Sequence, residues 1–567
     1  MIASSVAASG VMFAGCAEED PEDPDPGVGD DDTDDTADDT DPDEDRMTFH
    51  LTQQVEPNHD YDPIIANDAY STRMNWHIFD GLYEYGVGAE LVPQLAAEPI
   101  ETIDDTTYQV EIVDDATFHN GDPVTAEDVV HSFIAPVVEE TDNVTSYDMI
   151  DVEETQALDE TTVEFVLTEP YAPFATMTVG TAIVNKSARL DALGVSEDEW
   201  WDTDWSAEEE RGENSPYNKE NPIGCGPYEY VDHVDGEFTD LVRHEDYWGD
   251  EMPNVEEVRW VATEDDAART SQILAGDTDA AKGIAPDDYE VVEDDEDVTL
   301  HTEVGLGYFY VAFNCQDGPT AEVDVRRGVE HAFDMTAFVE QAIGPAGVNL
   351  PAPVGDPVLE AWDLPVDEYA AMENEYDPER AAELIEPHID GTWEPRLIAP
   401  PDDIRTQLME RIAARLGELD LDGAEIDPQV QRLDWGQFLD TYNTGDADDY
   451  AAYALGWTGG TDPDATLWAL FHESSAGINH GHFWDEDPQF HENLRDAREI
   501  TDFDQRRDLY DDVIRTILEE KIHLPGYVLL NSLAVRPEVE DAENAVHAQS
   551  SIAPRLISEG HNLSVHR

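Results

Sequence analysis

Apolar side chains occupy alternate positions in two short segments of the first third of the chain. They fall into two sets: Tyr108, Val110 and Ile112, and then Val163, Phe165 and Leu167. Successive side chains of a β-strand point to opposite faces, so each set marks one buried face. We therefore predict a half-buried strand in each segment.

A spacing of three or four residues predicts helices elsewhere. Thr125 can cap a helix whose third residue, Asp128, completes a capping box. Near the C-terminus an apolar stripe ends before Pro525 and consists of Tyr510, Val513, Ile514, Ile517 and Leu518. Such a stripe gives a helix one buried face. Strands and helices are interspersed without a fixed repeat, which favours a mixed α/β fold.

The first sixteen residues carry no charged side chain and end in Phe13-Ala14-Gly15-Cys16. Residues 1–16 resemble an export signal with a lipobox, in which the cysteine thiol is acylated and becomes the new first residue. No Lys or Arg precedes Cys16, although export signals usually carry one. The alternative is a buried strand or helix at the N-terminus. The segment that follows favours lipidation at Cys16.

Residues 17–45 consist mainly of Asp, Glu, Thr and Pro, with almost no apolar side chain to bury. Such a segment cannot compensate the entropy lost on ordering, so we expect a disordered acidic tether. No run of 18 or more apolar residues follows it, so the sequence predicts no transmembrane helix in the body. The prediction is a folded body tethered to a lipid anchor at the extracellular face of the cell membrane.

The charge balance excludes two classes of partner. The chain carries 27 Lys plus Arg against 134 Asp plus Glu among 567 residues, a formal net charge of -107. Proteins that bind nucleic acids or anionic membrane surfaces concentrate basic charge, so this balance argues against both. The acidic excess continues through the body, where concentrated salt would screen the repulsion. We interpret it as adaptation to high salt, with an ordinary acidic protein as the alternative.

Few residues point to catalysis or to metal binding. Cys225 and Cys315 remain besides Cys16, and they form either one bridge or two buried free thiols. The motifs of serine hydrolases, zinc peptidases, P-loop proteins and dinucleotide-binding proteins are absent from the sequence. His480 and His482 form an isolated pair, which is more often solvated than bound to a metal. We predict no cofactor, no metal and no enzymatic activity.

A series of short sequence blocks gives a stronger signal than these isolated residues. The blocks are Tyr108–Phe133, Leu167–Phe174, Asn221–Tyr228, Leu241–Gly249, Leu274–Asp279, Phe313–Asn314, Asp324–Arg327, Ala332–Asp334, Tyr376–Ala381 and Gly456–Trp457. In order and composition they resemble the family 5 extracellular solute-binding proteins of ABC importers, the peptide and nickel binding group, here as a lipoprotein of the haloarchaeal type. Gly121, Gly224 and Gly226, within these blocks, are expected to supply positive φ in turns.

This resemblance implies a periplasmic-binding-protein-like fold of type II, cluster C, with two α/β lobes joined by a hinge. Lobe I would comprise residues 46–309, including an extra subdomain, and residues 526–567. Lobe II would comprise residues 310–525. We expect the chain to cross between the lobes near 309–314 and near 523–527, and a ligand to be enclosed between them.

The resemblance also marks candidate ligand contacts. Oligopeptide binders of the family carry a Trp in an Asp/Glu-Trp-x-x-Phe-Leu segment, an Arg seven residues later, and an Asp three residues after the Trp of a Gly-Trp pair. Here Trp435 and Trp457 are retained, but Tyr442 stands in the Arg position and Gly460 in the Asp position. Asp462 could substitute for the missing Asp. The candidate ligand-binding residues are Trp435, Tyr442, Trp457, Gly459, Gly460 and Asp462.

The implied function is capture of a small solute and its delivery to a membrane permease driven by a separate ATPase. A di- or oligopeptide is the leading ligand, although an unpaired peptide terminus in a closed cleft would cost several kcal/mol. A sugar-like solute stacked on the two Trp side chains, or a metal chelate, is the alternative ligand. An anchored extracellular hydrolase and a surface adhesion or sensor module are the alternative functions. We expect a monomer.

Overall fold

The computed structural model describes most of the chain from residue 48 onward. The described residues are 48–53, 60–66, 69–85, 91–141, 143–144, 147–178, 180–205, 212–234, 236–263, 265–446, 448–476, 487–546, 556–558 and 561–566. Cys16, the predicted signal and tether segments, and the pair His480 and His482 lie outside them.

The strands and the capped helix predicted from the apolar patterns are confirmed. β5 (Thr107–Glu111) and β7 (Thr162–Val166) are antiparallel neighbours, each with its predicted apolar face buried. α2 (Ala126–Val138) follows Thr125, whose backbone N–H and Oγ1 donate to the Asp128 carboxylate at 2.9 and 2.6 Å. This pairing satisfies a donor that the first turn of a helix otherwise leaves free.

β5 and β7 belong to a small antiparallel sheet in the order β4-β5-β7-β6, in which β4 spans Glu101–Asp104 and β6 spans Gln156–Ala157. α2 covers one face of this sheet, since the Phe133 ring lies 4.8 Å from the Phe165 ring, centroid to centroid. The sheet and its helix form a subdomain next to the larger sheet described below.

The larger sheet has twelve strands among the described residues. Its order is β18 (Gln429–Arg432), β16 (Arg396–Ala399), β19 (Ala452–Trp457), β13 (Tyr308–Phe313), β20 (His523–Val535), β11 (Ala280–Lys282), β1 (Thr48–Gln53), β10 (Glu257–Ala262), β9 (Phe238–Arg243) and β8 (Tyr228–Val234), with β12 (Thr299–Val304) and β14 (Gly347–Asn349) also paired to β20. Two-stranded sheets complete the described strands: β2 (Tyr83–Tyr85) with β3 (Leu91–Pro93), β15 (Thr392–Trp393) with β17 (Glu425–Ile426), β21 (Val539–Glu540) with β24 (Ser564–Val565), and β22 (Ile557–Ser558) with β23 (His561–Asn562).

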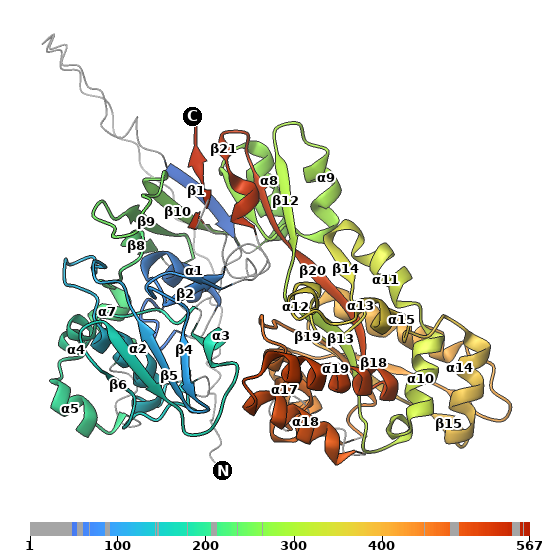
Figure 1. Cartoon of the computed structure of the whole chain (residues 1–567). Coiled ribbons are helices and arrows are strands. Elements are labelled where there is room, and N and C mark those ends of the chain that lie inside the picture. The colour runs from blue at the N-terminus through green and yellow to red at the C-terminus, as the bar shows by residue number, and fades with distance from the viewer. Residues whose placement is uncertain are drawn as a thin grey trace, which may run out of the picture. The chain divides into compact units, whose positions relative to one another are not determined.

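Strand β20 joins the two halves of this sheet, as its long red arrow in Figure 1 shows. Its first part pairs with β13 and β14 up to Leu529, and its second part pairs with β12 from Leu530 onward. Between β12 and β13 the chain makes a second passage through residues 305–307. Two segments that are distant in the sequence therefore connect the halves.

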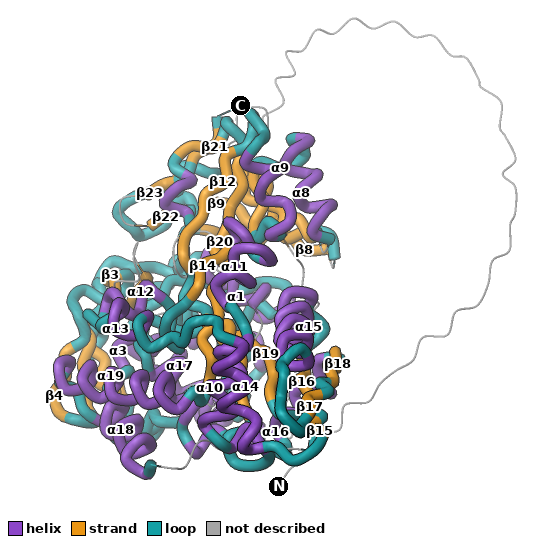
Figure 2. The backbone as a smooth tube through the Cα atoms, turned by 90° about the vertical axis from the view of Figure 1, so that its right-hand side faces the viewer, coloured by secondary structure: helices purple, strands orange, loops and turns teal. Residues whose placement is uncertain are grey.

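Helices cover the faces of both halves of the sheet. α10 lies beside α14 and α18 beside α19, as Figure 1 and Figure 2 show. α19 buries the whole apolar stripe predicted for it, which confirms that prediction. Besides α2, the α-helices of the described residues are α1 (Ala69–Ile78), α3 (Phe174–Met177), α4 (Lys186–Leu193), α5 (Glu197–Asp202), α7 (Pro216–Lys219), α8 (Asp266–Ala275), α9 (Tyr289–Glu293), α10 (Val323–Ala332), α11 (Met335–Ala342), α12 (Asp356–Ala361), α13 (Val366–Ala370), α14 (Pro378–Ile385), α15 (Asp403–Gly417), α16 (Trp435–Asn443), α17 (Asp464–Phe471), α18 (Pro488–Glu499) and α19 (Phe503–Glu520).

Buried apolar residues in the described part of the chain form two clusters. The cluster that we call the N-terminal core contains Phe118, Phe133, Phe165, Tyr228, Trp260, Val535 and Val565, among others. The cluster that we call the C-terminal core contains Tyr308, Phe338, Phe438, Leu494 and Ile514, among others. Residues of α8 and α9 also join the C-terminal core, because the continuous strand β20 links the two sides. The last strands of the chain return to the N-terminal core.

The two cysteines of the body belong to different cores. Cys225 is fully buried in the N-terminal core and Cys315 is buried in the C-terminal core, and both are free thiols. Burial raises the pKa of each thiol above its ordinary value. Of the two alternatives drawn from the sequence, buried free thiols are thus the one observed.

The glycines beside Cys225 act through close packing, not through positive φ as expected. Gly121 has the expected positive φ, of 84°, but neither Gly224 nor Gly226 has positive φ. A Cβ atom at Gly224 would lie 1.9 Å from the Ile78 carbonyl oxygen, and one at Gly226 would lie 2.8 Å from the His77 carbonyl oxygen. The end of α1 therefore rests directly on this segment, an approach that a side chain would block.

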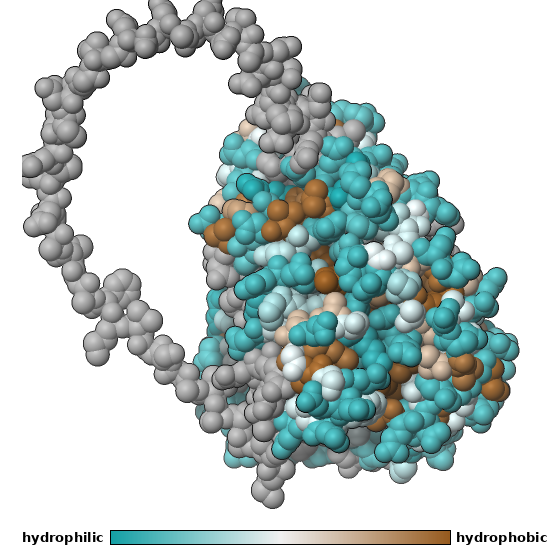
Figure 3. All heavy atoms as spheres, turned by 90° about the vertical axis from the view of Figure 1, so that its left-hand side faces the viewer, coloured by the Kyte–Doolittle hydropathy of each residue, from teal (hydrophilic) through white to brown (hydrophobic). Residues whose placement is uncertain are grey.

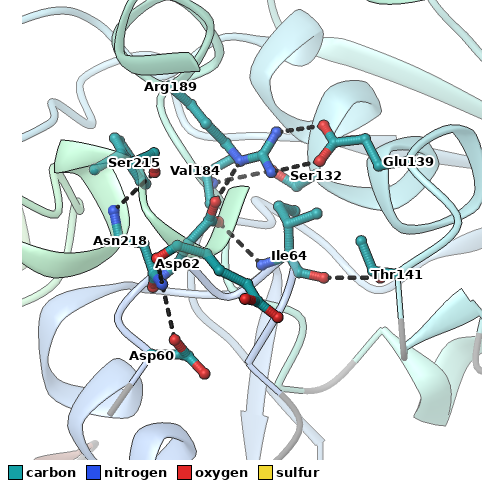
Figure 4. Close-up of polar contacts among 12 residues, drawn as sticks. Asp60, Asp62, Ile64, Ser132, Glu139, Thr141, Val184, Arg189, Ser215 and Asn218 are labelled. Atoms are coloured by element: carbon teal, nitrogen blue, oxygen red, sulfur yellow. Dashed lines mark hydrogen bonds and ion pairs between the residues drawn. The ribbon is translucent and has the colours of Figure 1, made fainter. Parts of the chain in front are cut away.

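A buried ion cluster links Asp62, near the start of the described chain, to the subdomain (Figure 4). The Arg189 guanidinium donates to Asp62 at 2.7 Å and, through two nitrogens, to Glu139 at 2.5 and 2.7 Å. The Trp200 indole N–H donates to the same Glu139 carboxylate at 2.7 Å. Two carboxylates thus share one cation, and burial raises the pKa of Asp62 above its ordinary value.

The face of the described body drawn in Figure 3 is largely hydrophilic. In the face drawn in Figure 3, apolar residues form separate patches within a hydrophilic surround. None of the helices in the described part of the chain is long and apolar enough to cross a membrane.

Candidate ligand-binding site

Four of the predicted ligand residues lie in one turn between β19 and α17. Trp457 ends β19, and its indole N–H donates to the Ala465 carbonyl at 2.8 Å. Ala465 belongs to the first turn of α17, so this bond holds the indole ring against the helix start. The ring remains partly exposed. Trp457 can therefore offer an aromatic face from a fixed position.

Gly459 brings this turn into direct contact with the passage between β12 and β13. Its φ is +73°, and a Cβ atom there would lie 2.3 Å from the Leu306 carbonyl oxygen. Gly460, next in the chain, would place a Cβ 2.8 Å from the Ala465 methyl carbon. Both glycines permit close backbone approach. The loop that carries these predicted ligand residues is therefore in close contact with residues 305–307, one of the two segments that join the halves of the sheet.

Asp462 lies inside the C-terminal half. Its side chain is 4% exposed and pairs with the Arg506 guanidinium at 2.9 Å, while Tyr510 donates its hydroxyl to the same carboxylate at 3.3 Å. The Asp464 backbone N–H donates to it as well, at 3.0 Å. The carboxylate is thus neutralised within its own half, and this geometry gives no support to its substituting for the missing Asp of oligopeptide binders.

Trp435 and Tyr442 lie at opposite ends of α16 and have different surroundings. Trp435 is 49% exposed, and its ring centroid lies 5.9 Å from that of Phe438 in a stacked arrangement. Tyr442 is 3% exposed and stacks on Tyr453 of β19 at 4.8 Å. Tyr442 is therefore a core residue, because the C-terminal end of α16 packs beneath β19, whereas Trp435 presents an aromatic surface.

Sequence reasoning missed a group of residues where the two cores meet. The Arg498 guanidinium carbon lies 4.3 Å from the Trp468 ring centroid and 4.7 Å from the Tyr171 ring centroid. Trp468 packs on the C-terminal core and Tyr171 on the N-terminal core. The sequence places Tyr171 only within a scaffold block. One signal that could have pointed to Arg498 is the scarcity of basic residues, since the chain has 27 Lys plus Arg among 567 residues.

Asp464 lies beneath this group, at the start of α17. It is 5% exposed, its Oδ2 is 3.7 Å from the Arg498 Nε, and its Oδ1 has no hydrogen-bond partner among the described residues. Burial raises the pKa of Asp464 to about 7, with Arg498 opposing the rise. A carboxylate with this pKa changes charge near neutrality.

A hollow of about 580 Å³ lies on the N-terminal side, between α1 and residues 247–251. Its walls include Trp248 and Asp80, and the Asp80 carboxylate accepts from the Trp248 indole and the Tyr247 hydroxyl, each at 3.1 Å. None of the six predicted ligand residues lines it. Within the described residues, no group of three His, Cys, Asp or Glu side chains is placed to hold a metal ion.

The family assignment follows from a match over most of the folded body. Residues 90–477 match the model of the bacterial extracellular solute-binding proteins, family 5. The chain belongs to this family. Its members are solute-binding proteins and not enzymes, and the predicted family resemblance is confirmed.

Named relatives extend over nearly the same span. The chain is 23% identical over 492 residues to the dipeptide-binding protein of Escherichia coli, covering 83% of this chain and 86% of that protein. It is 23% identical over 496 residues to the oligopeptide-binding protein AppA of Bacillus subtilis, covering 84% of this chain and 87% of that protein. These relatives are peptide-binding proteins by name.

Solved structures show the same fold. The substrate-binding protein CtaP of Listeria monocytogenes matches with a TM-score of 0.77 at 20% identity, covering 92% of this chain and 100% of that one. AppA of Bacillus subtilis in complex with a nonapeptide matches with a TM-score of 0.68 at 20% identity, covering 92% and 100%. The predicted mixed α/β, two-lobe fold of periplasmic binding proteins is thereby confirmed.

Proposed function

We propose that this protein is the extracellular, lipid-anchored substrate-binding component of an ABC importer. It encloses a small solute between two lobes, residues 46–309 with 526–567 and residues 310–525, and delivers it unchanged to a membrane permease. A separate ATPase supplies the energy for transport. Ligand contacts made by both lobes exist only in the closed form, so the ligand shifts the hinge equilibrium toward closure.

One observation carries this proposal. The loop that holds Trp457, Gly459 and Gly460 packs on residues 305–307, one of the two passages between the halves of the sheet. A solute that contacts the Trp457 ring from the cleft therefore touches an element attached to the hinge. This contact would couple binding to lobe movement, since the loop cannot move toward residues 305–307 without displacing the Leu306 carbonyl.

A di- or oligopeptide is the leading ligand, because the named relatives bind dipeptides and oligopeptides. The charged clamp of the family's oligopeptide binders has no equivalent at Tyr442, which is buried, or at Gly460. Peptide recognition here would rest on backbone hydrogen bonds and on aromatic contact. The exposed face of Trp435 favours, as a second candidate, an uncharged sugar-like solute or a metal chelate that stacks on the indoles.

Calorimetry in molar salt tests this assignment. We expect Trp457→Ala to weaken binding of the peptide that gives the largest thermal shift at least tenfold, with Trp435→Ala weakening it less. Trp201→Ala is the matched control, because Trp201 is 46% exposed on α5, outside the candidate loop. Equal affinities for Trp457→Ala and Trp201→Ala would reject the site. Consumption of the peptide during the titration would favour the alternative of an anchored hydrolase.

The anchor is part of the same proposal. Acylation at Cys16 and the acidic tether of residues 17–45 would keep the body near its permease at high effective concentration. The net charge of -107 supports a protein of haloarchaeal type that works in concentrated salt. Cys16→Ser should release the protein from cells into the medium, and continued membrane retention of that variant would place the anchor elsewhere.

A further inference from the structure

Arg498 contacts the N-terminal core through its side chain and through one main-chain hydrogen bond. The Ala172 backbone N–H donates to the Arg498 carbonyl at 2.7 Å. The Arg498 guanidinium lies between the Tyr171 and Trp468 rings, with its carbon 4.7 and 4.3 Å from their centroids. Arg498 thus contacts the N-terminal half with both its side chain and its backbone.

Both sides of this contact are firmly held. On the N-terminal side, the Tyr171 carbonyl accepts the Tyr108 hydroxyl at 3.2 Å, which ties residues 171–172 to β5. On the other side, Arg498 follows Leu494 and Ala497, which are fully buried in the C-terminal core. The Trp468 ring is itself stacked on His472 at 3.6 Å. The contact therefore joins side chains that are anchored in the two cores, and it breaks if the cores move apart.

We propose that Arg498 is a lobe-bridging residue that stabilises the closed arrangement before any ligand binds. The protonation state of Asp464, which lies beneath Arg498, sets how strongly that arrangement is favoured. This inference rests on the proposed function, since it assumes that the lobes open and close. We assign the arrangement described here, in which the guanidinium has aromatic faces on both sides, to the closed form; on opening it would keep Trp468 and lose Tyr171. A contact made in one state alone shifts the equilibrium toward that state.

The size of this shift follows from the interactions that opening breaks. A cation over an aromatic ring in a partly buried setting, together with one main-chain hydrogen bond, favours the closed form about tenfold. If the unliganded protein is already partly closed, ligand binding has to supply less of the free energy of closure. The apparent affinity for the ligand is therefore higher than it would be for a fully open protein. The bridging contact thus tunes affinity without touching the solute.

Asp464 makes the contact sensitive to protons. The groups that face it are Arg498 from α18, Arg506 and Tyr510 from α19, Asp462 from the preceding turn, and Tyr171 from the other half. Burial holds the pKa of Asp464 near 7 in the closed form, and hydration on opening would return it toward its ordinary value. The closed form then binds the proton more tightly. The closed fraction should therefore rise as the pH falls through about 7.

Distances between two spin labels in the unliganded protein test this inference. The labels are placed at Glu153→Cys and Glu418→Cys, exposed positions on opposite halves, in the chain released by Cys16→Ser. We expect the unliganded protein to show short and long distances. Arg498→Ala should lower the ratio of short to long about tenfold. Arg495→Ala is the matched control, because it lies one turn earlier on α18 and pairs with the partly exposed Glu473 at 3.1 Å.

The outcomes separate this inference from the proposed function. Identical distributions for Arg498→Ala and Arg495→Ala, in variants with unchanged thermal unfolding, would overturn the bridging role. A wild-type distribution with no short distance would overturn it as well. A saturating peptide that shortens the distance in wild type and in Arg498→Ala supports the proposed function regardless of these results, and failure in both would reject that function.

Asp464→Asn should remove the pH dependence of the closed fraction, and an unchanged dependence would exclude Asp464 as the proton-binding group.

Discussion

Arg189 holds together a cluster that the surrounding structure cannot neutralise without it. Asp62 and Arg189 are fully buried, and Glu139 is 7% exposed. A buried ion pair contributes little net stability compared with apolar residues of the same volume, but removal of one partner leaves a buried charge uncompensated. Here removal of the single cation would leave two carboxylates facing each other. At the scale of the residue, the stability of the N-terminal half should therefore be sensitive to loss of Arg189.

Arg189→Met should lower the free energy of unfolding by about 3–5 kcal/mol at pH 7, as measured by chemical denaturation in molar salt. The loss should shrink as the pH is lowered, because the pKa of Asp62 is raised and protonation then removes the uncompensated charge. The control is Arg380→Met, whose partner Glu383 is exposed, and it should change stability by less than about 1 kcal/mol. Similar losses in the two variants would contradict this account of the cluster.

At the scale of the element, apolar spacing predicted β5, β7, α2 and α19, because each has one face that is buried and one that is solvated. The sequence could not predict that β20 changes partners between Leu529 and Leu530, since both of its parts are equally apolar and the partners lie far away in the chain. Pairing across such a distance leaves no local pattern. The lobe boundaries drawn from the family resemblance therefore stay a proposal.

The candidate site was predicted in part, for a related reason. Trp457 and Gly459 could be placed together because they share one turn. Tyr442 could not be recognised as a core residue, because the packing of α16 under β19 decides its environment. Nor could Arg498 be recognised, because its partners Tyr171 and Trp468 come from different parts of the chain.

Gly459→Ala tests the contact between the ligand loop and the passage at 305–307. The added methyl group meets the Leu306 carbonyl at 2.3 Å and also sits on a backbone with φ of +73°. Gly391→Ala is a matched control, since Gly391 has φ of +71° but open space around its Cβ position. We expect Gly391→Ala to cost about 1 kcal/mol and Gly459→Ala at least twice that, measured by thermal unfolding. Equal costs would mean that the loop does not press on this segment.

At the scale of the whole molecule, we expect the net charge of -107 to make stability depend on salt. Charges of one sign repel across the surface, and the Debye length falls from about 10 Å at 0.1 M salt to about 3 Å at 1 M. If the acidic surface is an adaptation to salt, compaction of the folded body should depend on screening.

The midpoint of thermal unfolding should rise as KCl increases from 0.1 to 3 M. Most of the rise should occur below about 1 M, where the Debye length changes most. Sucrose at matched water activity should give a smaller rise, because it does not screen charge. A midpoint that is independent of KCl would contradict the interpretation of the acidic surface as an adaptation to salt.

The central claim is that two lobes close around a solute that leaves unchanged. The most direct measurement follows the distance between spin labels at Glu153→Cys and Glu418→Cys while the best-binding peptide is titrated in 3 M KCl. The peptide is then recovered, and its mass is determined by mass spectrometry. We predict a saturable shortening at one peptide per chain and recovery of the peptide at its original mass. Saturable binding at an unchanged distance, or recovery of a cleaved peptide, would contradict the account.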